Sequence, residues 1–230
     1  DVYKRQDIDA AGHERVDSLA EAEVFVNTSS DPAAVPYLPE NIQWVQYCFT
    51  GVNHLIDAGI IRSGGVPWCN SAGAFAKPVA ESALGLLLSQ AHHHKAFALA
   101  KSWSVSKELD ESQVWLYDQQ GPKHVVIVGA GGIGKQLIAY LKPFNVTITA
   151  VNRSGRTVEG ADATLPIERV DEVWGNADFV VSILPATAET EHFFNAEVFG
   201  AMKSTAVFIN VGRGSTVVLS LIHISEPTRP

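Results

Sequence analysis

The sequence predicts an α/β fold in which helices cover parallel β-sheets. Short apolar runs rich in valine and isoleucine alternate with segments of helical character along most of the chain. Such runs are typical of strands buried on both faces, and parallel strands are normally joined by helices. A polar, mixed stretch at 108–123 lies between two groups of these elements. We therefore expect a doubly wound parallel sheet in the second half of the chain and a separate α/β domain before it.

The first half is expected to contain two strands and two helices. Residues 22–26 and 42–48 have the composition of strands, and residues 53–59 have that of a short helix that ends at a glycine. Pro78 suits the first turn of a long helix from 79 to about 101. The body of this helix is too apolar for a solvated linker, so we expect it to pack between two domains.

A glycine-rich turn in the second half carries the strongest functional signal. The apolar run 125–128 continues directly into Gly129-Ala130-Gly131-Gly132-Ile133-Gly134, and residues 135–141 have the pattern of a helix. Gly129 permits a tight turn, Gly131 lets the backbone approach a pyrophosphate, and Gly134 lets the helix pack closely on the strand. A helix N-terminus also presents free N–H groups to phosphates. With a second strand at 146–151, the pattern predicts dinucleotide binding, and a purely structural turn is the alternative.

The end of the second strand predicts which dinucleotide is preferred. A carboxylate at this place hydrogen-bonds the 2′-hydroxyl of the adenosine ribose and repels a 2′-phosphate. The chain instead continues as Asn152-Arg153-Ser154-Gly155-Arg156. The two arginines can pair with a phosphate, and the serine can donate a hydrogen bond to it. We expect NADP(H) to be favoured over NAD(H), with a solvated basic turn as the alternative.

Two more apolar runs complete the predicted sheet. Residues 177–184 and 206–211 are expected to be buried parallel strands, with a short helix at 196–202 between them. Arg213 follows the last strand within Asn210-Val211-Gly212-Arg213-Gly214. An arginine at the carboxyl end of a parallel strand faces the crevice where open α/β sheets bind ligands. Its guanidinium can hold a carboxylate or polarise a carbonyl, and a surface arginine is the alternative.

The composition narrows the class of protein. A hydrophobic content of 46% indicates a core-forming globular protein, and a net charge of −8 disfavours a nucleic-acid binder. No apolar run approaches the roughly 18 residues that span a bilayer, so we expect no membrane association and a cytoplasmic protein. Cys48 and Cys69 are expected to be buried free thiols. For the run His92–His94 a solvated helix face is favoured over a metal site, and no metal is expected.

Both ends of the chain have the pattern of translated sequencing adaptor. One coding of residues 1–6 is GAT GTG TAT AAG AGA CAG, and its reverse complement translates to Leu-Ser-Leu-Ile-His-Ile, which is the sequence of residues 219–224. The pattern resembles the transposase mosaic end of tagmentation libraries, and residues 225–229 resemble the adaptor that follows it. We expect residues 1–6 and 219–230 to be artefacts of this kind and residues 7–218 to be a gene fragment.

Four motifs in order make residues 7–218 resemble the D-isomer-specific 2-hydroxyacid dehydrogenases, and most closely the glyoxylate/hydroxypyruvate reductase-like members. The motifs are residues 50–55, residues 70–73 with 79–81, the Gly129–Gly134 turn, and residues 184–190 followed by 210–214. The resemblance implies a partial flavodoxin-like substrate domain at 7–101, which includes the interdomain helix from 79. It also implies a partial Rossmann domain at 102–218, an active site in the cleft between the domains, and a homodimer of the intact protein.

The resemblance also implies a role for each motif. The backbone amides of Gly51 and Val52 would receive the substrate carboxylate, and Asn70 and Gly73 would line the cleft; ordinary turns are the alternatives. Arg213 would be the catalytic arginine that orients the keto acid for hydride transfer from the nicotinamide. The pyrophosphate cradle would consist of Gly131, Gly132 and Ile133, and further cofactor contacts would come from Leu184, Pro185, Thr190, Val211 and Gly212.

The implied reaction is the reduction of a small 2-keto acid to the D-2-hydroxy acid with NAD(P)H. Asn53 stands where the family normally has aspartate. The catalytic glutamate and histidine of the family lie beyond Arg213, in the part expected to be missing, so we expect this chain to be inactive or nearly so. The alternatives are a formate dehydrogenase relative and a dinucleotide-sensing corepressor that shares the fold and the arginine.

Overall fold

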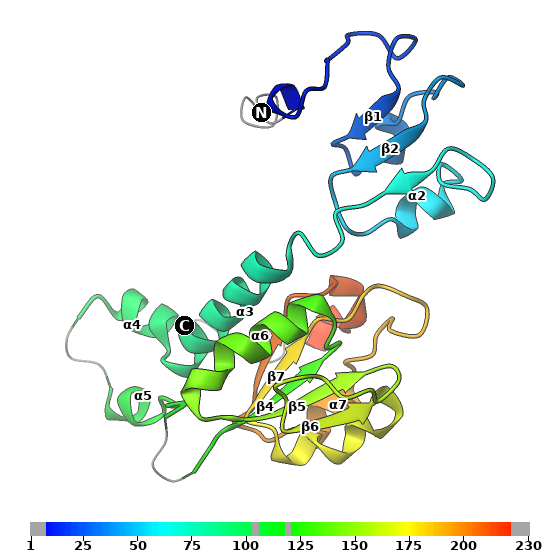
Figure 1. Cartoon of the computed structure of the whole chain (residues 1–230). Coiled ribbons are helices and arrows are strands. Elements are labelled where there is room, and N and C mark those ends of the chain that lie inside the picture. The colour runs from blue at the N-terminus through cyan, green and yellow to red at the C-terminus, as the bar shows by residue number, and fades with distance from the viewer. Residues whose placement is uncertain (1–7, 103–105, 118–120, 222–230) are drawn as a thin grey trace. The chain divides into compact units, whose positions relative to one another are not determined.

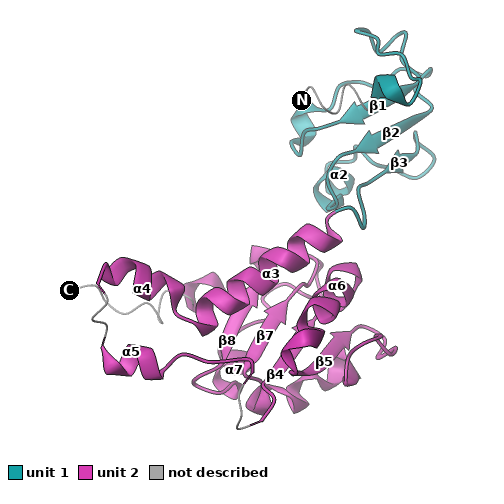
Figure 2. Cartoon of the chain, turned by 60° about the vertical axis from the view of Figure 1, so that its left-hand side comes forward, with its two compact units in different colours: residues 1–74 teal, residues 75–230 magenta. Residues whose placement is uncertain are grey.

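The computed structural model describes residues 8–102, 106–117 and 121–221. The adaptor-like sequence at 1–6 lies outside these ranges, and so does the part of the second one from 222 onward. The chain divides into two compact units, residues 1–74 and residues 75–230 (Figure 2). None of the helices in the described ranges is long and apolar enough to cross a membrane.

The first unit contains a three-stranded parallel sheet in the order β1-β2-β3. Two of these strands were predicted, and the structure confirms them in shorter form as β1 (Val24–Asn27) and β2 (Trp44–Tyr47). The predicted short helix is α2 (Asn53–Asp57), and Gly59 follows it with φ +69°. β3 (Trp68–Cys69) was not predicted, because two residues carry no periodicity and only pairing with β2 defines the strand.

The two cysteines are free thiols as predicted, but the prediction that both are buried is wrong. Cys69 is exposed, and Cys48 is partly buried; both are free thiols. Cys69 lies on β3, which is an edge strand and pairs only with β2, so its backbone and side chain are less covered than those of β2. The core of the unit is instead formed by Val45, Tyr47 and Leu55, which are at most 1% exposed.

The second unit contains the predicted doubly wound sheet, with five parallel strands in the order β6-β5-β4-β7-β8 (Figure 1). The chain runs from β4 outward through β5 to β6 and then returns to the other side of β4 for β7 and β8. The reversal of direction puts the switch point between β4 and β7, where such sheets bind ligands. The strands are β4 (His124–Val128), β5 (Thr147–Asn152), β6 (Ala163–Pro166), β7 (Phe179–Ser182) and β8 (Val207–Asn210).

Alternate residues of each strand belong to two separate hydrophobic clusters, one on each face. Val125 and Ile127 pack with α3 (Ala76–Ala91) and α6 (Gly132–Leu141). Val126 and Val128 pack on the opposite face, where the buried rings of Trp174 and Phe194 fill the core near α7 (Ala196–Ala201). In the central strand β4, residues 125–128 are buried, which explains the continuous apolar sequence after His124.

The long helix predicted for 79–101 is two helices. α3 ends at Ala91, and α4 (His94–Ala100) begins after His93, whose left-handed φ of +51° breaks the helix. α3 lies along α6 (Figures 1 and 2) and buries Ala80, Ala83 and Leu87. It is therefore part of the second compact unit, whereas the predicted domain boundary at 101/102 had assigned it to the first domain.

The histidine run at the end of α3 is only partly a solvated face. His92 is half-buried, and its ring lies 4.4 Å from the ring of Trp115. His93 Nε2 lies 3.1 Å from the Ser112 hydroxyl, and this contact ties the helix break to the end of α5 (Lys107–Glu111). His94 alone is exposed as expected. No group of three potential ligands for a metal ion occurs among the described histidines, cysteines and carboxylates.

Candidate cofactor site

The glycine turn after β4 adopts the tight conformation that its sequence predicts. Gly129 has φ +92°, and a Cβ added there would lie 2.9 Å from both the carbonyl carbon and the oxygen of Ile183. A side chain is therefore excluded both by the backbone conformation and by the neighbouring strand end. At Gly134 a Cβ would lie 3.3 Å from the Ala130 methyl and 3.4 Å from Ile127, which agrees with its predicted role in helix–strand packing.

The N-terminus of α6 leaves room for a phosphate group. Gly131 is the N-cap, and the first helical hydrogen bond is donated by Lys135 N–H to the Gly131 carbonyl at 2.9 Å. The N–H groups of Gly132, Ile133 and Gly134 precede that bond and have no acceptor within the helix. Gly131 and Gly132 are exposed, and a Cβ at Gly131 would meet no atom closer than 4.0 Å. This open, donor-lined end fits the pyrophosphate of a dinucleotide.

The residues after β5 form a compact turn at the same edge of the sheet. Asn152 ends the strand, and Arg153, Ser154 and Arg156 are exposed. Arg156 Nε donates to the Ser154 hydroxyl at 3.2 Å, so a guanidinium and a hydroxyl already lie side by side. The turn fits a phosphate monoester because such a group accepts hydrogen bonds from both kinds of donor.

The loop after β7 contacts the glycine turn. Leu184 is buried, Pro185 is exposed, and the Thr190 hydroxyl donates to the Pro185 carbonyl at 2.6 Å. A hydrogen bond from Thr187 is the main reason that the pKa of Glu189 lies below its usual value, and the nearby positive charge of Arg153 lowers it further. The loop thus brings one carboxylate close to the predicted phosphate turn.

Arg213 lies on a loop after β8 that is held by three internal hydrogen bonds. The Asn210 side chain accepts from Gly212 N–H at 3.0 Å and donates to the Arg213 carbonyl at 3.0 Å, and the buried Thr216 hydroxyl donates to the same carbonyl at 2.7 Å. Arg213 itself is exposed, and its Nη1 donates to the Gly212 carbonyl at 3.1 Å. No role for Asn210 was predicted from the sequence, and these bonds show that it holds the loop of Arg213.

Gly212 explains how the three loops come together. A Cβ at this position would lie 2.5 Å from the Leu184 carbonyl oxygen and 2.9 Å from the Leu184 nitrogen. Gly129 approaches the preceding peptide, at Ile183, from its own loop. Gly129 and Gly212 are 83 residues apart in the chain (212 − 129 = 83). They nevertheless pack against neighbouring backbone units, those of Ile183 and Leu184, just after β7. The structure thus joins the predicted motifs after β4, β7 and β8 at one edge of the sheet.

The predicted substrate residues form their own cluster in the first unit. Asn70 Nδ2 donates to the Thr50 carbonyl at 2.8 Å, directly before Gly51 and Val52, and the Ser71 hydroxyl donates to the Tyr47 carbonyl at 3.1 Å. Gly73 has φ +87°, which a residue with a side chain rarely adopts. The two motifs at 50–55 and 70–73 therefore meet at the carboxyl ends of β2 and β3.

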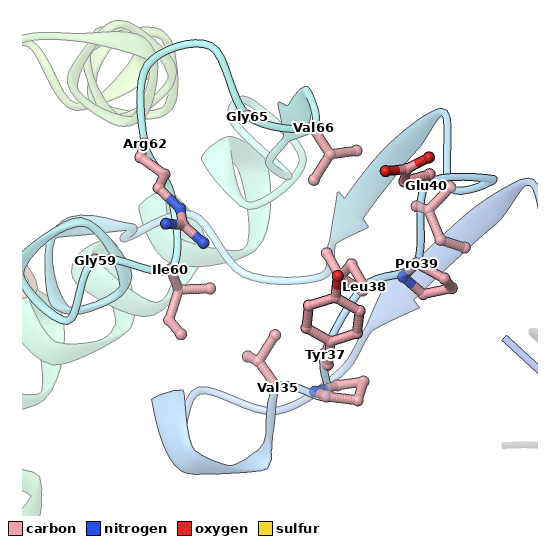
Figure 3. A pocket seen from close by; sticks show the side chains of 12 residues that line it. Val35, Tyr37, Leu38, Pro39, Glu40, Gly59, Ile60, Arg62, Gly65 and Val66 are labelled. Atoms are coloured by element: carbon pink, nitrogen blue, oxygen red, sulfur yellow. The ribbon is translucent and has the colours of Figure 1, made fainter.

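A cavity of about 540 Å³ in the first unit lies elsewhere (Figure 3). Its walls include Tyr37, Leu38 and Val66, and the side chains of Arg62 and Glu40 also line it. These residues come before β2 and β3 in the chain, so the cavity is at the amino ends of the strands. The substrate motifs are at the carboxyl ends, and the cavity is therefore separate from them.

The glycine turn, the switch point and the placement of Arg213 are those of a nucleotide-binding Rossmann domain, and comparison with known proteins agrees. The family described as D-isomer specific 2-hydroxyacid dehydrogenase, NAD binding domain, matches residues 84–223. The chain belongs to this family. The D-2-hydroxyacid dehydrogenases are NAD(P)-dependent oxidoreductases, so the predicted family, fold and cofactor class are confirmed.

Individual proteins are similar to this chain over much of its length. It is 47% identical over 210 residues to an uncharacterized protein in the proB 3′ region of Corynebacterium melassecola, a match that covers 91% of this chain and 67% of that protein. It is 35% identical over 144 residues to glyoxylate/hydroxypyruvate reductase B of Escherichia coli, covering 60% and 43%. The chain spans about half of the length of the reductases that it matches.

A solved structure shows the same fold. A D-isomer specific 2-hydroxyacid dehydrogenase family protein from Aeromonas salmonicida superimposes with a TM-score of 0.76 at 26% identity. The superposition covers 96% of this chain and 73% of that one. The fold of this chain is therefore the fold of that family protein.

Proposed function

We propose that the intact protein reduces a small 2-keto acid, of the glyoxylate or hydroxypyruvate type, to the D-2-hydroxy acid with NADPH. The observation that carries the proposal is the meeting of the glycine turn, the Leu184 loop and the Arg213 loop at the switch point of the sheet. Its relative from Escherichia coli is named a glyoxylate/hydroxypyruvate reductase, which supports the substrate class.

The residues of the second unit have distinct roles in this reaction. Gly132 and Ile133 bind the pyrophosphate through backbone N–H groups. Gly131, whose own N–H donates to the Gly129 carbonyl, contributes the open space for the pyrophosphate. Leu184, Pro185, Thr190, Val211 and Gly212 line the cofactor site. The bound nicotinamide supplies the hydride. Arg213 holds the keto acid and stabilises the negative charge that develops on its carbonyl oxygen, since a guanidinium presents paired donors to oxygen atoms.

The first unit supplies the groups that select a 2-keto acid. The backbone amides of Gly51 and Val52 bind the carboxylate, and Asn70 holds their loop through its bond to the Thr50 carbonyl. Asn70 and Gly73 border this substrate site. These groups select a 2-keto acid because the carbonyl that accepts the hydride must lie directly beside the carboxylate that the amides hold.

NADP(H) is the proposed cofactor because of the turn after β5. Arg153, Ser154 and Arg156 are exposed there, and no carboxylate occupies the strand end at Asn152. Two guanidinium groups and a hydroxyl stabilise a 2′-phosphate, whereas NAD(H) has no group that would use them.

The intact protein is further proposed to be a cytoplasmic homodimer. Leu86, Leu99 and Trp115 are 47–65% exposed on the second unit, and a second copy would cover apolar surface of this kind. Light scattering on the intact protein tests this, and a monomeric mass would contradict it. The two free cysteines fit a reducing compartment.

The deciding experiment uses the full reading frame of the intact protein. It is assayed with glyoxylate and hydroxypyruvate, each with NADPH and NADH. Turnover with a preference for NADPH is expected. Turnover with NADH alone would refute the cofactor preference but keep the reaction class, and cofactor binding without turnover would refute the reductase activity. The 230-residue chain itself is expected to bind NADP⁺ with little or no turnover, because no glutamate–histidine pair of the family pattern follows Arg213.

A further inference from the structure

The turn after β5 is held from within by the side chain of Asn152. Its Nδ2 donates to the Arg156 carbonyl at 2.7 Å, and its Oδ1 accepts from Ser154 N–H at 3.1 Å and from the Ser154 hydroxyl at 3.4 Å. Both lone pairs of the amide oxygen are therefore used inside the turn. Asn152 is half-buried, whereas the two residues that it holds are exposed.

The hydrogen bonds form a chain that ends at a guanidinium. Arg156 Nε donates to the Ser154 hydroxyl at 3.2 Å, and that hydroxyl donates in turn to Asn152 Oδ1. Bonds linked in this way polarise one another. The position of the Arg156 side chain consequently depends on the side-chain amide of Asn152, to which two successive hydrogen bonds connect it.

β6, a second strand that was not predicted from the sequence, supports the same turn. β5 and β6 pair with Asn152 opposite Pro166. Gly155 has φ +67°, and a Cβ there would lie 3.1–3.3 Å from three atoms of Pro166. The turn is thus seated on the end of β6, so its backbone is fixed on one side by the sheet and on the other by Asn152.

We propose that Asn152 is a positioning residue that determines the preference for NADP(H). It holds Ser154 and Arg156 in the arrangement that binds the 2′-phosphate, and it acts through them without contacting the cofactor. The inference rests on the proposed function, because it requires that the turn binds the adenosine end of NADP(H). A site that is ordered before binding loses less side-chain freedom on binding, so removal of the brace weakens the phosphate contact.

The test measures binding of NADP⁺ and NAD⁺ to the 230-residue chain by titration calorimetry. Asn152→Ala is expected to weaken NADP⁺ binding about tenfold, the effect of releasing one or two side chains, and to change NAD⁺ binding less than about twofold. Thr157→Ala, at the exposed residue that follows the turn, is the matched control and should change neither affinity. The same measurements are made with 2′,5′-ADP and 5′-AMP, which carry the adenosine end with and without the 2′-phosphate. They show whether the effect arises at that end of the cofactor.

A double-mutant cycle separates positioning from direct contact. If Asn152 acts through Arg156, Arg156→Ala weakens NADP⁺ binding in the wild type but adds little in the Asn152→Ala background. Additive losses would overturn the proposal, and so would equal weakening of NADP⁺ and NAD⁺ or no effect of Asn152→Ala. Wild-type chain that binds neither dinucleotide, or prefers NAD⁺, would refute the proposed cofactor itself, a result distinct from the others.

A second variant keeps the proposal testable if the alanine variant folds poorly. Asn152→Asp has the same shape and retains the acceptor for Ser154, but it places a carboxylate oxygen against the Arg156 carbonyl. NADP⁺ binding is expected to fall by more than tenfold, because the brace is lost and the new charge repels the phosphate. Unchanged NADP⁺ affinity in this variant would overturn the proposal.

Discussion

At the scale of single residues, glycines of the same motif have different reasons for being glycine. Gly129 is required by the protein itself, because its φ is +92° and a Cβ would overlap the backbone of Ile183. Gly131 has open space around it, with no atom within less than 4.0 Å of a Cβ. The motif predicts a tight turn at Gly129 and an open approach at Gly131, and the distances around the two glycines agree with that division.

This difference leads to a prediction for a matched pair of variants. Gly129→Ala should lower the free energy of unfolding by at least about 2 kcal/mol, from strained backbone and overpacking together. Gly131→Ala should leave stability nearly unchanged but weaken NADP⁺ binding, because its methyl group occupies the approach of the pyrophosphate. Urea unfolding and calorimetric titration measure the two effects. Equal loss of stability in both variants would contradict the distinction.

A second residue-scale prediction concerns acid stability. Burial is the main cause that lowers the pKa of His124 below 6.5, and its Nε2 lies 2.8 Å from the Thr149 hydroxyl. The unfolded chain therefore binds this proton more readily than the folded one. The stabilisation is fully present above pH 6.5 and is lost as the pH falls from 6.5 through the lowered pKa.

His124→Gln should therefore reduce the slope of stability against pH below 6.5, while the decline at lower pH persists. That second decline comes from Asp178, whose carboxylate accepts from Lys203 and from His124 N–H, each at 2.8 Å. Burial opposes the charge of Asp178, but these two donors outweigh it and lower its pKa. Its share of stability is lost only as the pH falls through that lowered value. Urea unfolding from pH 8 down to about pH 2 measures both declines, because the Asp178 contribution is lost only below 3.8. An unchanged slope in the variant between pH 6.5 and 4 would exclude the role of His124.

At the scale of elements, α3 shows how packing decides where a helix belongs. Its buried residues Ala80 and Ala83 are small, and they let the helix approach α6 closely. The apolar residues of α3 were expected to pack between two domains. Several of them pack instead in the core of the second unit, against the Rossmann sheet and α6. Helix pairs of this kind tolerate little extra volume at the contact.

Two substitutions at neighbouring positions of α3, one buried and one exposed, test this packing. Ala83 is fully buried, and Ala83→Leu should destabilise the protein by about 1–3 kcal/mol through overpacking. Gly85 is exposed in the same helix, and a Cβ there would meet no atom within 4 Å. Gly85→Ala should therefore stabilise it by about 0.4–1 kcal/mol. Thermal unfolding of both variants measures the two changes in stability. If Ala83→Leu leaves the stability unchanged, α3 does not pack closely on α6.

At the scale of the whole molecule, long apolar runs identified the central strands, while short elements escaped prediction. β4, β5 and β7 were found because burial on both faces demands largely apolar sequence. β8 was found because its sequence is also apolar, although it lies at the edge of the sheet and is mostly only partly buried. β6 was missed because Ala163–Pro166 is only partly buried at the sheet edge and ends in proline. The helix break at His93 was missed because nothing in a run of histidines marks a left-handed residue.

The sequence by itself determined the fold class and the family, and it predicted the residues of the cofactor site. These follow from local patterns, namely apolar periodicity and a glycine spacing that nucleotide binding requires. Only the tertiary structure decided which residues support that site. Gly129 and Gly212 meet at the Ile183–Leu184 backbone, and Asn152 and Pro166 enclose the turn after β5. These contacts join positions far apart in the chain, and no local pattern encodes a distance between them.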